Sequence, residues 1–251
     1  GATGNVGEAV IQYLLEAESS VEVLAGVRNI EKAKRHLSDH LNLKFVEFDF
    51  AKPETFSTAL RGTNRVFLLR PPSLADVKQY FDPLLKAMKT ADVQEVVFLS
   101  VQGAERSSVI PHHKIEKLIR EYELDYIFLR PSYFMQNLTT TLLDDIQRKR
   151  KIILPAGKAN FNWVDVQNIG EVAAKMMLDF ENYKNQAYEV TGYENENFHT
   201  IAQQISKVVD DEVTYKNVNP LRFFFIKWQE GMTFGKIMVL LALHFLPRFQ
   251  D

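Results

Sequence analysis

The first seven residues, Gly1-Ala-Thr-Gly-Asn-Val-Gly7, place a glycine at every third position directly before a predicted amphipathic helix. In a dinucleotide-binding loop, the first glycine permits the turn from strand to helix, the second lets a pyrophosphate reach the backbone, and the third allows close packing. The helix start adds free N–H groups and a positive dipole end, which attract phosphate. The spacing therefore predicts a phosphate-binding loop, the alternative being a glycine turn without a ligand. The predicted cofactor-binding residues are Gly1, Thr3, Gly4, Asn5, Val6 and Gly7.

Apolar runs and amphipathic helical stretches alternate over the first half of the chain. The runs at 21–27, 45–50, 65–69, 95–100 and 126–130 are rich in β-branched and aromatic residues. Apolar residues at helical spacing separate them at 7–18, 74–91 and 112–123. This alternation is typical of βαβ units with right-handed crossovers. We therefore predict an α/β fold, with a Rossmann-type doubly wound parallel sheet, for an NAD(P)-binding core at residues 1–131.

The pattern loosens after residue 131, where predicted strands at 151–155, 161–165 and 187–191 mix with helices at 134–149, 168–180 and 198–209. This predicts a small C-terminal α+β substrate lobe over residues 132–251, packed with the core as one globular unit. The apolar segment at 236–246 has about half the length needed to span a bilayer. We expect a buried or interface helix there. The neighbouring run Phe223–Ile226 favours an apolar patch suited to a homodimer or a protein partner.

Composition excludes several classes of protein. The chain has 251 residues, 46% hydrophobic and 25% charged, which is ordinary for a globular domain. Its net charge of −2 provides no basic field for direct nucleic-acid binding. Without cysteine it has no disulfide or cysteine nucleophile, and its scattered histidines predict no metal site. We expect a cytoplasmic protein without a membrane span.

The start of the chain is unusual for such a fold. A dinucleotide loop follows a β-strand, yet here the loop glycine is residue 1. The other end, at 244–251, stops without a closing element. We therefore expect a fragment trimmed at both ends, in which the first strand of the sheet is missing. Its absence predicts a gap between the strands formed by the runs 21–27 and 65–69.

Arg28 follows the run 21–27, where such a fold recognises the cofactor ribose. NAD-specific sites place an acidic residue here for the 2′-hydroxyl, whereas a guanidinium can pair with a 2′-phosphate. We therefore expect NADP(H) to be favoured over NAD(H). The alternative is that Arg28, with Lys32 and Lys34, forms a solvated helix start.

Further candidates follow the next predicted strands, because ligands of open α/β sheets bind outside the carboxyl ends of the strands. Asp49 and Phe50 are expected at the adenine end of the cofactor. The loops after the runs 65–69 and 95–100 are expected to line the nicotinamide end, with Gln102 toward the substrate. Ser100 is explained equally well as a helix or turn cap. The cofactor candidates in these loops are Leu69, Arg70, Ser100 and Val101.

Several motifs then occur in a specific order: the glycine loop, Val27-Arg28-Asn29, the run ending at Ser100, the stretch from Glu116 to Pro131, and residues 163–169. Together they resemble the NmrA-like branch of the atypical short-chain dehydrogenase/reductases over nearly the whole chain. The resemblance implies a Rossmann-type fold. That family includes NADPH-dependent quinone and azo-dye reductases, ether and isoflavonoid reductases, and nucleotide-sensing regulators, so the fold does not settle the function.

The sequence departs from the wider superfamily at its catalytic motif, Tyr-x-x-x-Lys. Counting back from Glu116 gives His112 in place of the lysine and Ser108 in place of the tyrosine. Without that pair, direct hydride transfer to an electron-poor acceptor is favoured, with water or an imidazole of near-neutral pKa supplying the proton. The candidate catalytic residues are His112, His113 and Lys114, the alternative being an ordinary first turn of a helix.

The resemblance also implies that the loop after Pro131 covers the nicotinamide and shapes the substrate pocket. The candidate substrate residues are Tyr133, Phe134, Met135 and Asn137, although Phe134 is explained equally well as core. The predicted function is an NAD(P)H-dependent oxidoreductase that transfers hydride from NADPH to a small flat acceptor such as a quinone. The alternative is a non-catalytic NADP(H)-binding redox sensor that regulates a partner protein.

Overall fold

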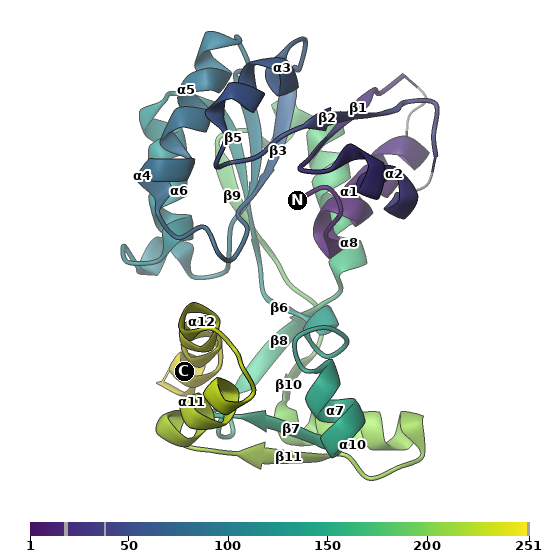
Figure 1. The fold of residues 1–251 in the computed structure, drawn as a ribbon, viewed down its shortest axis with the longest axis vertical. Helices are drawn as coiled ribbons and strands as arrows, with labels where there is room; N and C mark the ends of the chain where they lie inside the picture. The colour runs from purple at the N-terminus through teal and green to yellow at the C-terminus, as the bar shows by residue number, and fades with distance from the viewer. Residues whose placement is uncertain (18–19, 38, 250–251) are drawn as a thin grey trace. The chain divides into compact units, whose positions relative to one another are not determined.

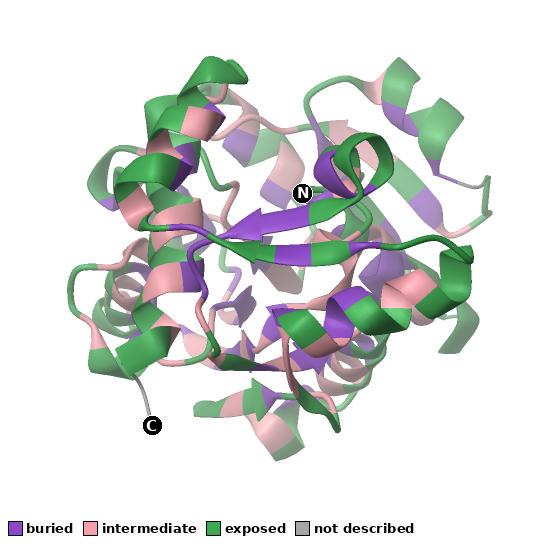
Figure 2. Cartoon of the chain, turned by 90° about the horizontal axis from the view of Figure 1, so that it is seen from below, coloured by how far each residue is buried: buried purple, intermediate pink, exposed green. Residues whose placement is uncertain are grey.

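The computed structural model describes residues 1–17, 20–37 and 39–249 and contains two compact units (Figure 1). The first unit combines Gly1–Pro131 with Val166–Val190, and the second combines Ser132–Asp165 with Thr191–Asp251. The chain therefore passes between the units three times. Many helices bury residues on one side and expose residues on the other, as Figure 2 shows.

The first unit is built on parallel strands in two separate sheets. One sheet has the order β3 (Arg65–Leu69), β4 (Glu95–Leu99), β5 (Asp125–Pro131) and β9 (Gln186–Val190), and the other pairs β1 (Val23–Val27) with β2 (Leu43–Glu47). The register aligns Leu69, Leu99 and Leu129, so β3 and β4 end beside the last residues of β5. The parallel α/β architecture predicted from the alternating pattern is confirmed.

The helices of the first unit largely follow the predicted apolar spacing. They are α1 (Asn5–Ala17), α2 (Ile30–His36), α3 (Phe56–Leu60), α4 (Val77–Tyr80), α5 (Asp82–Thr90), α6 (Pro111–Glu121), α8 (Val166–Leu178) and α9 (Phe180–Tyr183), with 3₁₀ turns η1 (Pro53–Thr55) and η2 (Ala104–Arg106). The single helix expected at 74–91 is divided at Phe81, because Pro83 lacks an N–H and sits in the first turn of α5. Buried side chains of α5 and α6 share one core with Phe98 and Phe128 of the sheet.

The gap predicted between the runs 21–27 and 65–69 is present. In the part of the chain that the structure describes, β1 and β3 do not pair, and a cavity of about 670 Å³ is lined by residues of both strands. Apolar side chains of α1 and of both sheets border it, among them Val10 and Leu68. Gly1 and Gly7 border the same cavity, which places the glycine loop beside these strands.

The second unit is an α+β fold with its own core. Its strands β10 (Asn195–Asn197), β8 (Asn160–Val164) and β6 (Tyr133–Phe134) form one sheet, and β11 (Thr214–Asn217) pairs in parallel with β7 (Lys151–Leu154). Its helices are α7 (Leu143–Lys149), α10 (Phe198–Val209), α11 (Pro220–Gln229) and α12 (Phe234–Phe245), with 3₁₀ turns η3 (Met135–Asn137) and η4 (Leu246–Phe249). The rings of Tyr133, Trp163 and Phe198 meet edge to face in its core. None of the described helices is long and apolar enough to cross a membrane.

The division of the chain differs from the continuous lobe expected at 132–251. The segment Val166–Val190 belongs to the first unit, where α8 contacts α1 and β9 pairs with β5. A Cβ on Gly170 would lie 2.5 Å from the Cβ of Ala9, so this glycine lets the two helices approach closely. The helix expected from residue 134 begins only at Leu143. Local patterns predict such elements, but the sheet that a strand joins depends on distant partners.

Candidate functional site

The glycine loop closes a tight turn at the start of α1. The Gly4 N–H donates to the Gly1 carbonyl oxygen at 3.0 Å, and the Glu8 N–H donates to the Gly4 carbonyl oxygen at 2.8 Å. A Cβ on Gly7 would collide with the Gly1 carbonyl oxygen and lie 2.8 Å from its carbonyl carbon. The first N–H groups of α1 thus adjoin bare backbone, which forms a cradle suited to a pyrophosphate. The other predicted loop residues are Thr3 and Asn5, which are exposed, and Val6, which is buried.

Arg28 follows β1 and lies close to this loop. The charge of Arg28 acts on Gly1, so the guanidinium lies within electrostatic reach of the loop. Arg28 is exposed, and its side chain has no ion pair or hydrogen bond among the described residues. The next residue, Asn29, caps α2 by accepting the Lys32 N–H at 2.8 Å. An unpaired guanidinium near a phosphate cradle is suited to a further phosphate.

Asp49 and Phe50 lie in a turn after β2. Asp49 accepts the Ala51 N–H through Oδ1 at 3.0 Å. The Phe50 ring meets Phe48 edge to face, with 5.0 Å between the ring centroids. Both predicted residues are half-buried, Phe50 also against the ring of Phe81 at 5.0 Å between centroids, and their contact with an adenine stays a prediction.

Arg70 carries an uncompensated charge at the end of β3. The preceding side chain, Leu69, lies against Gly1, which brings Arg70 near the glycine loop. Arg70 Nη1 donates to three carbonyl oxygens of the 71–74 segment at 3.1 Å each, and Nε donates to His112 Nε2 at 3.4 Å. No carboxylate within the described ranges pairs with this guanidinium, and burial lowers the pKa of Arg70. The site therefore holds a fixed cation.

His112 is neutral near pH 7. Burial, and after it the charge of Arg70, lowers the pKa of its imidazole to about 3. Because Nε2 accepts from Arg70, the proton of the neutral ring is on Nδ1. The expectation of a near-neutral pKa was therefore wrong for His112, because burial disfavours the imidazolium. Its neighbours in the first turn of α6 are His113, whose Nδ1 donates to the Ala104 carbonyl oxygen at 2.9 Å, and Lys114, which is exposed.

Ser100, just after β4, belongs to a buried network that sequence reasoning missed. Its hydroxyl donates to Glu116 Oε1 at 2.6 Å, and Glu116 is 1% exposed. Arg130 of β5 donates to both Glu116 oxygens, from Nε at 3.0 Å and from Nη2 at 2.7 Å, and pairs with Glu105. The hydrogen bonds to Glu116 raise the pKa of Arg130. The network ties α6 to two strands, which favours the structural interpretation of Ser100.

Val101 and Gln102 continue from Ser100 along the same edge. The Gln102 N–H donates to the Pro131 carbonyl oxygen at 3.0 Å, and its side-chain amide donates to Glu189 Oε2 at 2.9 Å. Val101 is half-buried. Within the first unit, Arg28, Arg70 and residues 100–102 thus each follow the carboxyl end of a strand, and Leu69, the last residue of β3, lies against Gly1 of the glycine loop.

The predicted substrate residues at 133–137 belong to the second unit. Tyr133 is buried, its hydroxyl donates to His244 Nε2 at 2.9 Å, and burial raises its pKa. Tyr133 is thus a core residue of this unit. Phe134, Met135 and Asn137 are half-buried, and their contact with a substrate stays a prediction.

The buried His244 predicts a loss of stability in acid. Its Nδ1 donates to the Leu240 carbonyl oxygen at 2.7 Å, and burial lowers its pKa to about 4. An unfolded histidine binds a proton near pH 6.5, so the folded state loses stability as the pH falls below about 6.5. The free energy of unfolding changes by about 1.4 kcal/mol per pH unit in this range. Lowering the pH from 7 to 5 should therefore reduce the unfolding free energy of the second unit by about 2 kcal/mol.

Urea unfolding followed by tryptophan fluorescence measures this loss, because Trp163 and Trp228 both lie in the second unit. In His244→Gln, the difference in unfolding free energy between pH 7 and pH 5 should shrink by that amount. His199→Gln is the matched control, since His199 is exposed in the same unit. An undiminished difference in His244→Gln would contradict a buried neutral imidazole.

The parallel sheet and the glycine cradle with an arginine after β1 define a nucleotide-binding fold of the Rossmann type. The NmrA-like family matches residues 1–240, and the chain belongs to this family. The resemblance seen in the sequence is thereby confirmed.

Named relatives are moderately similar. The chain is 29% identical over 223 residues to Prestalk A differentiation protein A of Dictyostelium discoideum, covering 89% of this chain and 72% of that protein. It is 29% identical over 222 residues to NAD(P)H azoreductase of Xenophilus azovorans, covering 86% of this chain and 74% of that protein. The structure of an NADPH-dependent quinone oxidoreductase of Escherichia coli, complexed with NADPH, superposes on this chain with a TM-score of 0.85 at 20% sequence identity. The match covers 100% of this chain and 89% of that one. That likeness confirms the fold.

Proposed function

We propose that the chain is an NAD(P)H-dependent reductase that prefers NADPH and transfers hydride to a small, flat, electron-poor acceptor such as a quinone. The observation that carries the proposal is the bare cradle at α1, with the unpaired Arg28 close by. A pyrophosphate fits the cradle because Gly7 leaves no side chain over the helix start. A 2′-phosphate suits Arg28, whose guanidinium can form two parallel hydrogen bonds with it.

The names of relatives support the reductase class. One relative is an NAD(P)H azoreductase, and a protein of the same fold is an NADPH-dependent quinone oxidoreductase. Azo and quinone groups are electron-poor and accept hydride without a Tyr–Lys pair to polarise them. This chemistry suits a chain with Ser108 and His112 at the two positions of that pair.

The bound nicotinamide cofactor supplies the hydride. The chain's own residues bind and orient: the N–H groups of α1 hold the pyrophosphate, and Arg28 holds the 2′-phosphate. Arg70, held by the 71–74 carbonyl groups and by His112, stabilises negative charge near the end of β3. Because His112 stays neutral and its Nε2 is used by Arg70, water supplies the proton that completes the reduction.

A non-catalytic NADP(H)-binding redox sensor is the second candidate. The observation that favours it is the neutral His112, whose ring orients Arg70 and offers no acid near pH 7. Turnover separates the two functions: the protein is mixed with NADPH and a panel of quinones, and the nicotinamide absorbance is followed. Oxidation of NADPH is the expected result. Binding without oxidation by any quinone would reject the reductase and leave the sensor.

Replacing Arg28 with alanine is expected to raise the dissociation constant of NADPH by about tenfold or more, because a charge-assisted pair contributes about 1.5–3 kcal/mol. The dissociation constant of NADH should stay nearly unchanged, because NADH has no 2′-phosphate. Titration of nicotinamide fluorescence measures both. Arg61→Ala, which removes another exposed arginine of the first unit, is the control. An equal loss for NADPH and NADH would exclude the 2′-phosphate contact.

A further inference from the structure

The C-terminal helices of the second unit expose an unusual amount of apolar surface. On α11, Leu221, Phe225 and Trp228 are 75%, 62% and 54% exposed. Exposed apolar side chains continue along α12 and η4 at Phe234, Met238, Val239, Leu243, Leu246 and Phe249. We call these side chains the apolar face. Soluble monomers seldom gather so many large apolar side chains on their surface without a binding function.

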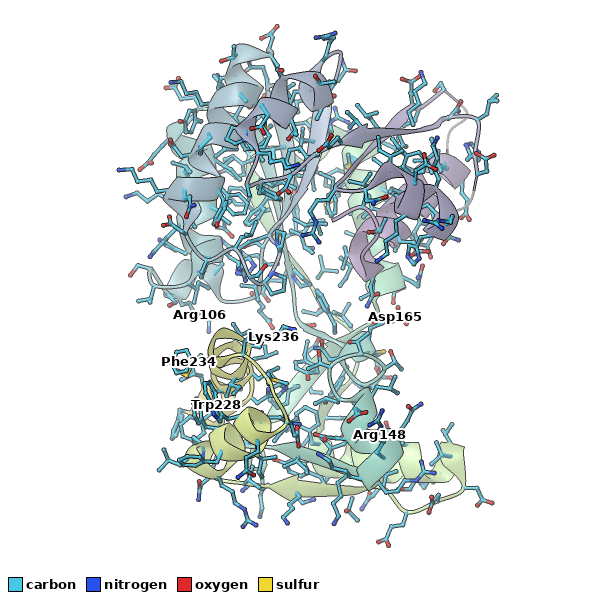
Figure 3. The ribbon with its side chains drawn as sticks, in the orientation of Figure 1. Arg106, Arg148, Asp165, Trp228, Phe234 and Lys236 are labelled. Atoms are coloured by element: carbon cyan, nitrogen blue, oxygen red, sulfur yellow. The ribbon has the colours of Figure 1, made fainter. Side chains whose placement is uncertain are left out.

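The side chains of the apolar face are continuous across the two helices. Leu221, Phe225 and Trp228 are spaced four and three residues apart, which places them on one side of α11. The ring of Phe224 stacks on Trp228 at 5.8 Å between centroids and meets Phe234 of α12 edge to face at 5.9 Å. Figure 3 labels Trp228 and Phe234 on these neighbouring helices.

The helix α12 is apolar on its exposed side as well as its buried side. Ile237 and His244 are buried, whereas Phe234 and Met238 are exposed, and Lys236 is the only Lys, Arg, Asp or Glu of the helix. A helix apolar all round belongs in a protein core or in lipid. With 12 residues, α12 is about 18 Å long, too short for a hydrocarbon layer of about 30 Å. It can lie in the surface of a bilayer without spanning it.

The exposed charge around the apolar face is positive. Residues 213–249 contain five basic side chains, of which Lys227 is buried, and one acidic side chain, Glu230. Glu230 is neutralised by ion pairs with Lys149 and with Lys227, the latter at 2.9 Å. Arg222 and Lys236 are exposed, and neither has an ion-pair partner among the residues that the structure describes. The face therefore presents aromatic and aliphatic side chains with free cations beside them.

We propose that the apolar face docks on the surface of an anionic lipid bilayer, with α11 and α12 lying in the plane of the headgroups. The apolar side chains enter the acyl boundary, Trp228 lies at headgroup depth, and Arg222 and Lys236 extend to lipid phosphates. Charge disfavours a second copy of the chain as the occupant, because two identical cationic faces repel each other. An anionic bilayer supplies both the apolar layer and the complementary charge.

Co-sedimentation of the full chain with vesicles tests this docking. The vesicles contain phosphatidylcholine alone, or phosphatidylcholine with about one third phosphatidylglycerol, at low and high salt. We expect binding to the anionic vesicles, weakened by salt, with a blue shift of Trp228 fluorescence. Phe234→Glu should lower the partition coefficient at least about tenfold, and Lys236→Gln about fivefold on anionic vesicles alone.

Helix α10 offers matched controls on the same unit. Val208→Glu and Lys207→Gln change an exposed apolar and an exposed basic residue outside the apolar face, and both should bind vesicles like the unmodified protein. Circular dichroism verifies that each variant is folded. If Phe234→Glu does not fold, the proposal is tested by the weaker binding of Lys236→Gln and by the salt dependence of vesicle binding.

Three results would overturn the proposal. The first is no sedimentation of the unmodified chain with anionic vesicles. The second is equal binding by the variants of the apolar face and the α10 controls. The third is a dimer in sedimentation velocity that Phe234→Glu dissociates while vesicle binding is absent, which would assign the face to a second copy of the chain.

Discussion

Replacing Arg130 with methionine is expected to destabilise the first unit by about 3 kcal/mol, because a buried carboxylate loses its nearest charged partner and keeps only Arg120 at 3.6 Å. Glu116 is 1% exposed and accepts hydrogen bonds from Arg130 at 3.0 and 2.7 Å. Methionine retains part of the apolar packing of the arginine stem without its charge, so the loss reports mainly on the ion pair. Urea unfolding followed by far-ultraviolet circular dichroism measures it.

Helix α6, which carries Glu116, also provides the control for this prediction. Lys117 and Glu121 on α6 form a pair at 3.5 Å whose side chains are 70% and 55% exposed. Lys117→Met should cost less than about 1 kcal/mol, because water solvates the remaining charge. In the Arg130→Met background, Glu116→Gln should recover part of the loss, since it removes a buried carboxylate that keeps only Arg120, at 3.6 Å, as a charged partner. Similar losses in Arg130→Met and Lys117→Met would contradict the buried pair.

Gly7→Ala is expected to raise the dissociation constant of NADPH about a hundredfold, which follows from the proposed nucleotide site. The new Cβ would collide with the Gly1 carbonyl oxygen, a backbone atom that side-chain rotation cannot move away. The loop must open, and the N–H groups of α1 then lose their alignment with a phosphate. Two charge-assisted hydrogen bonds weakened by about 1.4 kcal/mol each account for the expected change.

Fluorescence titration with NADPH measures the change, and thermal unfolding shows whether Gly7→Ala remains folded. Gly235→Ala is the control, because a Cβ on Gly235 meets no atom within 4 Å. It should bind NADPH as the unmodified chain does. A folded Gly7→Ala protein with unchanged affinity for NADPH would show that the cradle holds no phosphate.

Sequence reasoning succeeded where the physical cause is local. Glycines three residues apart before an amphipathic helix determine both the turn and the access to the first N–H groups of that helix. The glycines and the hydrogen bonds of the turn lie within residues 1–8. Alternating apolar runs and helices likewise predicted the parallel sheet, because buried strands and amphipathic helices differ in their period. Arg28 could be named as the cation after β1 because its position follows directly from the end of the predicted strand.

Sequence reasoning failed where partners are distant. Arg130 and Ser100 reach Glu116 from separate strands, and no local pattern marks three such residues as one network. His112 was expected to titrate near neutrality, but burial, and after it the charge of Arg70, 42 residues away, lowers its pKa to about 3. The place of Val166–Val190 in the first unit likewise depends on α1 and β5.

The sequence by itself determined the class of sheet, the glycine turn at the start of α1 and the arginine after β1, because turn geometry and helix periodicity act over a few residues. Only the tertiary structure decided the charge state of His112, the partners of Ser100 and the exposure of Trp228 and Phe234. Those properties depend on how much water each group loses and which charges surround it, and burial and pairing arise only when distant segments pack together.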